Sequence, residues 1–472
     1  MPEPIGVQEV YTDTECKLLD LLNSPALLDI IVVAQNPRHK PMLMKVNARS
    51  VAGFVVVLSA SVALAAPGAV RCGQLIDVRA GRVLNDQLVS FDGSGIITAV
   101  ASFSSMPMPA GITPIDLSHV TCLPGLIDVH THLTHDPEDS GYKRLGVSVP
   151  RATVVGVKNA RLTLLAGFTT VRNVGAHGYS DVGVRDGINR GEIPGPRMLV
   201  SGPALGITGG HCDENLLPFE YHHTAEGVAD GPWSARERVR EVIKFGADVI
   251  KVCASGGVLS KGDLPGAPQY TLEEMQAIVA EAHKLDRKVA AHAHGTQSIK
   301  DAIRAGIDSI EHSSLIDDEG ITLAKQHGTY LVFDIYNDDY ILSMGDKVGM
   351  LPESIEKEKT IGRLQRENFR KAFHAGAKMA FGTDSGVYPH GQNAKQFSKM
   401  VEWGMKPTDA IQAATVNAAE LLGWGDKVGE LSKGHFADLI AVEGDPLSDV
   451  KTLENVRFVM KGGMVAKNDL TH

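Results

Sequence analysis

Short apolar runs alternate with amphipathic segments through the middle of the chain. The runs have the length and the Val, Ile and Ala content of buried strands, whereas the segments between them repeat apolar residues at helical spacing. Two of these segments, 234–247 and 271–286, open with Ser234 and Glu237 and with Thr271 and Glu274, at the spacing of a helix capping box. The expected strands are 122–130, 169–175, 197–202, 248–254, 288–294, 307–312, 329–335 and 378–383.

Eight strands that alternate with helices over about 300 residues predict a (β/α)8 barrel of the TIM type, and we place it at residues 122–425. A doubly wound open sheet is the alternative. The glycine-rich stretch "ASGGVLSKGDLPG" does not support an open nucleotide-binding sheet, because it contains neither GxGxxG nor GxxxxGK[ST]. We expect a long loop there, after the fourth strand.

Residues 66–121 and 426–472 have a different pattern of apolar and polar residues. Both segments contain short strand-like runs separated by turns rich in Gly and Asp. We therefore expect one small β-sandwich domain that is assembled from both ends of the chain.

The segment before residue 66 has the pattern of a secretory signal peptide. A basic start with Lys45 and Arg49 precedes an apolar run that ends in small residues up to Ala65. The run is short of the ~20 residues that a membrane anchor needs, so no membrane span is expected after cleavage. We predict a periplasmic or secreted protein that is cut after Ala65.

Translation from Met42 or Met44 would give a signal peptide of about residues 42–65 and would make residues 1–41 an upstream extension. Residues 1–65 are therefore left out of the fold prediction.

Composition narrows the functional class. The chain of 472 residues is 43% hydrophobic and 22% charged, as in soluble globular proteins, and its net charge of −10 argues against nucleic-acid partners. Cleavage would leave four cysteines without CxxC spacing or a dense disulfide framework. They are compatible with one disulfide whose pairing stays open, and they are Cys72, Cys122, Cys212 and Cys253.

Histidines fall at the ends of the predicted strands. In "PGLIDVHTHL", His130 and His132 are two residues apart, so a strand would point both the same way. An isolated pair is more often a satisfied polar feature of a strand end. Here, however, candidate ligands recur at the carboxyl ends of five strands, where barrels of this type carry their chemistry. The six candidates are His130, His132, Lys251, His292, His312 and Asp384.

Each candidate has an ordinary alternative explanation when taken alone. Lys251 could be a snorkelling lysine, His312 a core histidine and Asp384 a helix N-cap. The coincidence of all six favours a metal site, and neutral imidazoles with a carboxylate and few thiols favour zinc or a similar divalent ion.

Three further residues are candidates for contacts with a substrate. His294 follows His292 by two residues and faces the same side, so we expect it to contact the substrate or the transition state. His211, in "GITGGHCD", is a similar catalytic candidate, although an exposed loop histidine explains it equally well. Tyr270 ends the loop after the fourth strand and is a candidate for substrate binding.

Several of these stretches together resemble the metal-dependent amidohydrolase superfamily over residues 70–466. The closest resemblance is to the branch of imidazolonepropionase-like proteins and Xaa-Pro dipeptidases, which includes secreted dipeptidases and ochratoxinase-type amidases. The order of the motifs is unbroken and their metal positions match. The motifs are "PGLIDVHTHL", "GFTTVRNVG", "KVCASGGVLS", "AAHAHG", "IEHSS", "FGTDSG" and "GELSKGHFADLIAVEGDPLSDV".

The resemblance implies a centre with two divalent ions, zinc being favoured. His130 and His132 would bind one ion together with Asp384, and His292 and His312 would bind the other. Lys251 would be carboxylated on its amine and bridge the two. The metals would lower the pKa of a bridging water and polarise the scissile carbonyl, while Asp384 would pass a proton to the departing amine.

The implied activity is hydrolysis of the amide bond to a terminal amino acid, in dipeptides, N-acyl amino acids or aryl amides such as ochratoxin A. Members of the branch are commonly homo-oligomers, often octamers. One alternative is ring opening of a cyclic amide by an imidazolonepropionase-type enzyme, and another is a catalytically silent barrel that binds a ligand. A serine hydrolase is disfavoured because the sequence has no GxSxG elbow.

Overall fold

The computed structural model describes residues 66–106 and 111–470. The predicted signal peptide lies outside these residues. None of the helices in the described part is long and apolar enough to cross a membrane.

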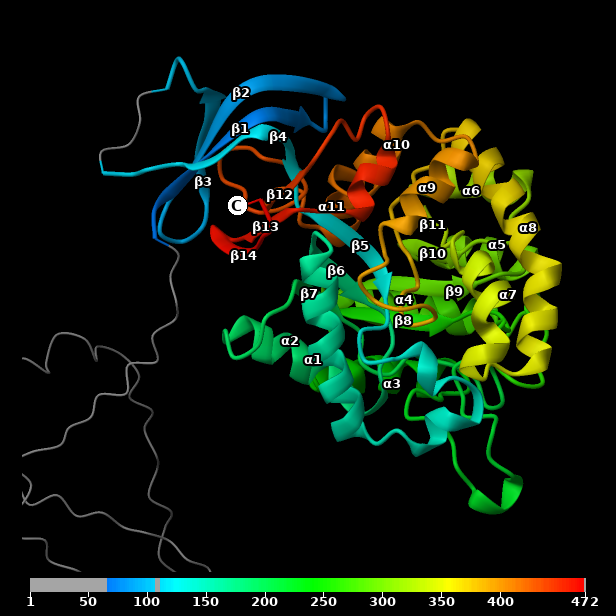
Figure 1. Ribbon diagram of the computed structural model, residues 1–472. Helices are drawn as coiled ribbons and strands as arrows, with labels where there is room; N and C mark the ends of the chain where they lie inside the picture. Colours follow the sequence, from blue (N-terminus) through cyan, green and yellow to red (C-terminus); the bar gives the residue numbers. More distant parts are fainter. Residues whose placement is uncertain (1–65, 107–110, 471–472) are drawn as a thin grey trace, which may run out of the picture. The chain divides into compact units, whose positions relative to one another are not determined.

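Strands from both ends of the chain form one seven-stranded sheet, in the order β14-β13-β12-β4-β1-β2-β3. Its centre is the antiparallel pair of β12 with β4, which brings residues more than 300 positions apart side by side (Figure 1). The seven strands are β1 (Gly68–Asp77), β2 (Arg82–Phe91), β3 (Ile97–Ser102), β4 (Ile115–Pro124), β12 (Leu439–Val442), β13 (Phe458–Lys461) and β14 (Met464–Asn468).

The composite sheet has a core of its own, in which Val70, Val89, Leu117, Phe458 and Met460 are buried together. A disulfide between Cys72 and Cys122 joins its neighbouring strands β1 and β4. The described strands from both ends make one sheet rather than two stacked layers. The β-sandwich is therefore not confirmed, and the predicted domain boundaries stay predictions.

Two parallel sheets make up the middle of the chain. The first has the order β5-β6-β7 and the second the order β11-β10-β9-β8. The strands are β5 (Leu126–Thr131), β6 (Phe168–Asn173), β7 (Arg197–Val200), β8 (Val249–Cys253), β9 (Lys288–Ala293), β10 (Ser309–His312) and β11 (Tyr330–Val332).

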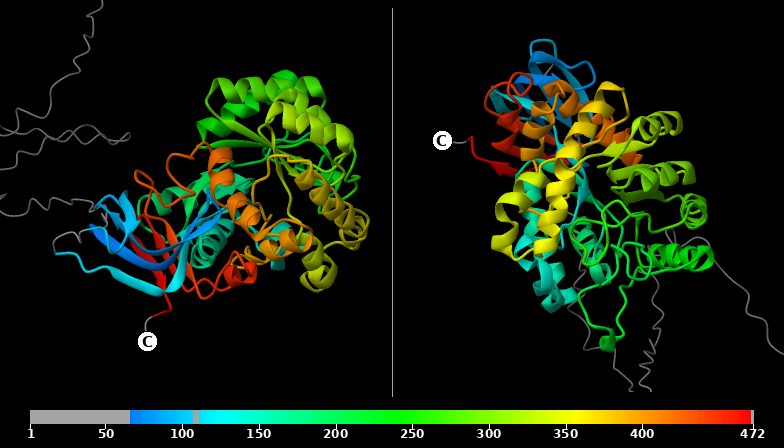
Figure 2. Two further views of the ribbon diagram at one scale, coloured as in Figure 1. Left: turned by 90° about the horizontal axis from the view of Figure 1, so that it is seen from above. Right: turned by 90° about the vertical axis from the view of Figure 1, so that its right-hand side faces the viewer.

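Helices follow most of these strands, and Figure 2 shows the green and yellow helices lying outside them. The helices are α1 (Val149–Leu165), α2 (Ser180–Asn189), α3 (Pro232–Lys244), α4 (Leu272–Lys284), α5 (Thr296–Ala305), α6 (Asp318–His327), α7 (Asn337–Val348), α8 (Pro352–His374), α9 (Lys395–Glu402), α10 (Pro407–Ala413) and α11 (Val416–Leu422).

The predicted barrel is confirmed in part. Seven of the eight expected strands form. Residues 378–383 do not form a strand and are joined to β11 and β5 only by isolated backbone hydrogen bonds. The amide of Leu331 donates to the carbonyl of Lys378 at 2.9 Å, and the amide of Val129 donates to the carbonyl of Phe381 at 2.9 Å. Gly382 permits a close approach of this segment to β5, because a Cβ there would lie only 2.8 Å from the Cβ of His130. The two sheets are joined by bridges rather than by a continuous ladder.

The two predicted capping boxes differ in outcome. Thr271 and Glu274 form the expected reciprocal box at the start of α4. The prediction for Ser234 and Glu237 is wrong, since α3 begins two residues earlier at Pro232. Proline suits this first helical position because its fixed φ is already helical and its missing N–H needs no partner.

Candidate metal centre

β5 carries the first pair of predicted ligands. His130 lies on this strand and His132 directly follows its end, with ring centroids 5.5 Å apart. The Asp384 Oδ1 atom lies 3.4 Å from the Nε2 atom of His130 and 3.1 Å from that of His132. Asp384 has φ +55°, a left-handed conformation that Asp and Asn tolerate better than other side chains. This turn brings the carboxylate to both rings.

β9 and β10 carry the second group. His292 and His294 follow each other at alternate positions of β9 and its carboxyl end, and His312 ends β10, with ring centroids 4.5–4.7 Å apart. One ligand atom from each of these three lies within 4.8 Å of the others, and so does one from each of His130, His312 and Asp384. His312 thus stands between the two groups, and His294 lies at ligand distance although it is predicted to contact the substrate.

Three of these imidazoles are in the uncharged form that can bind a metal ion. Burial lowers the pKa of His130, His292 and His294 well below the usual histidine range, so these rings are uncharged at neutral pH. His312 differs from these three rings. Burial would lower its pKa too, but the negative charge of Asp334, which also accepts a hydrogen bond from Nδ1 at 3.0 Å, raises it above its usual value. A neutral ring nitrogen is the form that binds a cation.

Lys251, on β8, completes the set. Its Nζ atom and both ring nitrogens of His130 are buried and have no hydrogen-bond partner among the described residues. Burial lowers the pKa of Lys251 to about 8, although Glu311 and Asp384 act in the opposite direction. Buried polar atoms without partners destabilise a protein unless a ligand satisfies them. The His and Asp donor set therefore fits a divalent metal ion, and the buried Lys251 amine lies in the same cavity without a partner among the described residues.

Several supporting residues were not predicted from the sequence. Asp334, just after β11, orients His312 and accepts hydrogen bonds from Asn337 at 2.7 Å and Gln365 at 2.6 Å. A carboxylate at the end of an expected strand was the signal that could have revealed it. Arg172 donates to Glu311 at 2.8 Å in the buried core, and Glu311 Oε2 lies 3.1 Å from His130 Nδ1. No spacing in the sequence indicates that pair.

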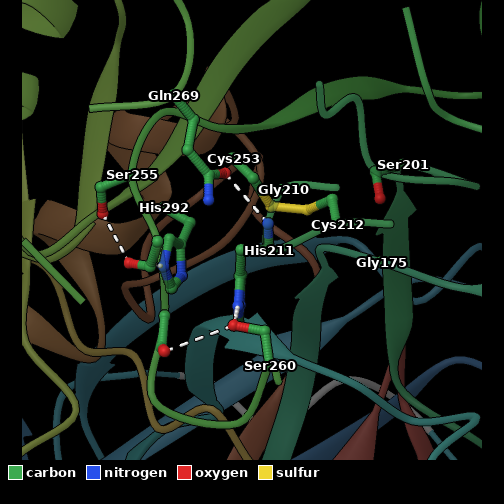
Figure 3. The surroundings of a disulfide bond; sticks show 12 residues. Gly175, Ser201, Gly210, His211, Cys212, Cys253, Ser255, Ser260, Gln269 and His292 are labelled. Atoms are coloured by element: carbon green, nitrogen blue, oxygen red, sulfur yellow. Dashed lines mark hydrogen bonds between the residues drawn. A yellow bond between two sulfur atoms is a disulfide. The ribbon is translucent and has the colours of Figure 1, made fainter. Parts of the chain in front are cut away.

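His211 lies against the metal centre rather than on the surface. Its ring stacks on that of His292 at a centroid distance of 4.0 Å, and its Nδ1 atom is 2.8 Å from the Ser260 hydroxyl. A disulfide joins the next residue, Cys212, to Cys253 at the end of β8 (Figure 3). The sequence is compatible with one disulfide of unknown pairing, and the structure has two.

Tyr270 does not lie with the candidate ligands and substrate contacts. It is buried, its hydroxyl donates to the carbonyl of Ala229 at 3.0 Å, and it is absent from the described residues that line the cavity. Nothing in its surroundings indicates a contact with a substrate.

The ligand candidates line a cavity of about 600 Å³. We call the six candidates His130, His132, Lys251, His292, His312 and Asp384 the floor. We call the lining residues on loops and on α8 the rim, and those used below are Arg144, His211, Glu214 and Glu358. The cavity is large enough for a small ligand of the size of a dipeptide.

Comparisons with known proteins agree with this geometry. The model of the amidohydrolase family matches residues 121–466. The chain is 36% identical over 369 residues to ochratoxinase of Aspergillus niger, which covers 73% of this chain and 75% of that protein. It is 23% identical over 382 residues to imidazolonepropionase of Caldanaerobacter subterraneus, covering 72% of this chain and 81% of that one.

Among solved structures, a Xaa-Pro dipeptidase with methionine bound in its active site is similar to this chain at 36% identity. The TM-score is 0.78, and the match covers 85% of this chain and 99% of the dipeptidase. The fold is therefore α/β and similar to a TIM barrel, and the predicted family resemblance is confirmed. The chain belongs to the amidohydrolase family, whose hydrolytic chemistry on amide bonds fits the His and Asp cluster at the floor.

Proposed function

We propose that this protein is a two-metal hydrolase that cleaves the amide bond to a terminal amino acid. Its substrates would be dipeptides, N-acyl amino acids or aryl amides of the ochratoxin A type. The observation that carries the proposal is the convergence of four strand-end histidines, Asp384 and a buried, unpartnered Lys251 on one cavity. The similarity to an ochratoxinase and to a Xaa-Pro dipeptidase supports the choice of substrate class.

The floor offers two ligand groups. His130, His132 and Asp384 would hold one ion, and His292 and His312 the other, with Lys251 between them. A ring nitrogen of His294 lies within 4.8 Å of those of His292 and His312, but we assign this residue to the substrate rather than to a metal ion. Zinc suits this mixture of neutral imidazoles and carboxylate, and when bound such ions polarise a carbonyl and lower the pKa of water.

Carboxylation of Lys251 is favoured by its surroundings. Only the neutral amine reacts with carbon dioxide, and a pKa of about 8 leaves roughly a tenth of the side chains neutral at pH 7. At the usual lysine pKa of about 10.4 the neutral fraction would be below roughly one in a thousand. The product is an anion with two oxygens, which can hold two cations.

Asp384 is placed to move the proton. Burial would raise its pKa, but the nearby His130 and the hydrogen bond with His132 outweigh burial and lower the pKa to about 2. The carboxylate is therefore ionised at neutral pH. Asn337 donates to its Oδ2 atom at 3.1 Å and fixes its orientation. Asp384 would accept a proton from the attacking water and deliver it to the nitrogen of the departing amine.

His294 and His211 would contact the substrate. The Nδ1 atom of His294 lies 2.8 Å from the Ser314 hydroxyl, and that of His211 is bound to Ser260. In each ring the serine contact fixes the orientation, and Nε2 would be available to the substrate.

The test is release of amino acids from a panel by the purified, metal-loaded chain. The panel contains dipeptides, N-acyl amino acids, ochratoxin A and, for the alternative of a cyclic-amide hydrolase, imidazolonepropionate. We expect release from the open-chain amides and little ring opening. Ring opening alone would replace the proposal by the alternative, and no turnover of any compound would favour a ligand-binding barrel.

We also propose that the chain is exported and self-associates. Two disulfides among the described residues support an oxidising compartment. N-terminal sequencing of exported material should start at Ala66 or within a few residues of it, and mature material that retains Met1 would contradict export. The homo-oligomer, an octamer in many relatives of the branch, rests on the resemblance alone. Light scattering after gel filtration would test it.

A further inference from the structure

One face of α8 lines the cavity above the metal centre. Ser354, Glu358, Ile361 and Gln365 all contribute to the lining, and their spacing places them along one side of the helix. Gln365 marks the deep end, because its Nε2 atom donates to Asp334 at 2.6 Å and to the carbonyl of His312 at 3.1 Å. Glu358 lies seven residues earlier, which is about 10 Å along the helix axis.

Glu358 is a buried carboxyl group without a partner. It is 5% exposed, and none of the described residues forms a hydrogen bond or an ion pair with it. Burial and the neighbouring Asp338 and Asp334 raise its pKa to about 8. Arg366 is near, but its guanidinium is already paired with Asp338 at 2.8 Å. At neutral pH this carboxyl group is mostly protonated, and a cation that reaches it lowers its pKa again, so that it ionises and pairs with the cation.

The cavity offers Glu358 little positive charge. Arg144 and Lys251 are the only lysine or arginine residues among the described residues that line it, and Arg144 already donates to Glu214 at 3.0 Å. Apolar side chains line the cavity on the segments that adjoin Glu358. They are Ile341 on α7, Met350 and Leu351 between the helices, and Ile361 on α8.

These apolar side chains form a sleeve around one carboxyl group, which matches the chemistry of a long basic side chain. Lysine and arginine carry an aliphatic stem that packs on apolar surface and a charged head that needs an acceptor. We propose that Glu358 and this sleeve form a specificity subsite for the basic side chain of a lysine- or arginine-containing amide substrate. The inference rests on the proposed function, because it names the substrate class of the same cavity.

The first test compares matched substrates with the metal-loaded full chain. Lysine is placed on either side of the scissile bond, in Ala-Lys and in Lys-Ala, and each is compared with the same dipeptide containing norleucine. Norleucine keeps the stem and lacks the ammonium group. We expect kcat/KM for one lysine dipeptide to exceed that of its norleucine partner by about tenfold or more.

The variants assign that preference to one residue. Glu358→Gln should bring the two kcat/KM values to within about threefold of each other, and Glu358→Met should do the same if the amide variant folds poorly. Glu356→Gln is the matched control, because Glu356 is on the solvent side of α8, 70% exposed and paired with Lys359. The control should keep the full preference. Equal rates for lysine and norleucine in the parent, or an undiminished preference in both Glu358 variants, would overturn the proposal.

A binding measurement separates this inference from the proposed function. Calorimetry with free lysine and free norleucine needs no turnover, and the parent should bind lysine about tenfold more tightly while the Glu358 variants do not. If no dipeptide is cleaved but this difference is present, the proposed hydrolysis fails and the subsite stands. If dipeptides are cleaved and the difference is absent, the subsite fails and the hydrolase stands.

Discussion

The floor and the rim of the cavity are held in place in different ways. Four of the six floor residues lie within the parallel strands β5, β8, β9 and β10, and His132 directly follows β5. The sixth, Asp384, is fixed by a backbone hydrogen bond to His130 of β5. The rim residues lie on long connections and on α8. His211 is held by a disulfide and a serine, and Arg144 by a single ion pair.

The difference explains which property each part controls. Strand register fixes the floor to within the tolerance that metal ligands need, so the chemistry is set by backbone geometry. The rim depends on loops and on one helix, which vary more easily without unfolding the barrel. Changes at the floor should therefore abolish the reaction, whereas changes at the rim should alter its efficiency or its choice of substrate.

Lys251→Ala is expected to have the largest effect. It removes the side chain that is proposed to supply a shared anion between the two ligand groups, so most bound metal and most activity should be lost while the fold is retained. Metal analysis and turnover are measured together, with circular dichroism as the folding control. A variant that keeps the parent's metal stoichiometry and activity would show that Lys251 is an ordinary strand residue.

Asp384→Asn comes next. Asn tolerates the left-handed backbone at φ +55° and keeps one ligating oxygen, but it cannot accept the proton. Turnover should fall by roughly 10²–10⁴-fold, with metal at the His292 and His312 side retained. Asn is as good as Asp at a helix N-cap, so near-parental turnover would return Asp384 to a structural role.

Removal of either disulfide is expected to have an intermediate effect, and the two double variants can be compared with each other. They link residues 50 and 41 positions apart, so loss of either should reduce the free energy of unfolding by a similar amount, about 4 kcal/mol. Only the Cys212–Cys253 bond adjoins His211. Cys212→Ser with Cys253→Ser should lower kcat/KM roughly ten- to a hundredfold, because the ring over His292 loses its anchor.

Cys72→Ser with Cys122→Ser is the control for that pair. It should lower the melting temperature similarly and leave kcat/KM within about twofold. Equal losses of activity in the two double variants would mean that the Cys212–Cys253 bond stabilises the fold without positioning His211.

Tyr270→Phe should have the smallest effect. The hydroxyl contacts only the carbonyl of Ala229 among the described residues, so its loss should reduce the free energy of unfolding by about 1 kcal/mol and leave kcat/KM unchanged within about twofold. A rise in KM without a change in melting temperature would instead place Tyr270 at the substrate.

The same contrast explains how far the sequence could predict this molecule. His130 and His132 were found because a period of two in a strand makes their direction certain, and Lys251, His292 and His312 followed from the strand ends. The stacking of His211 on His292 could not be read in this way, because it depends on a loop whose path is fixed by the Cys212–Cys253 bond. Glu358 was missed because a glutamate on an amphipathic helix usually faces solvent.

Metal dependence of amide hydrolysis is the central claim, and titration of metal-free protein tests it most directly. The protein is stripped with a chelator and dialysed, zinc is added back in steps, and release of amino acid from the best open-chain amide is followed. We predict no release without metal and full recovery at two equivalents of zinc per chain. Undiminished release from protein shown by metal analysis to be metal-free would contradict the account.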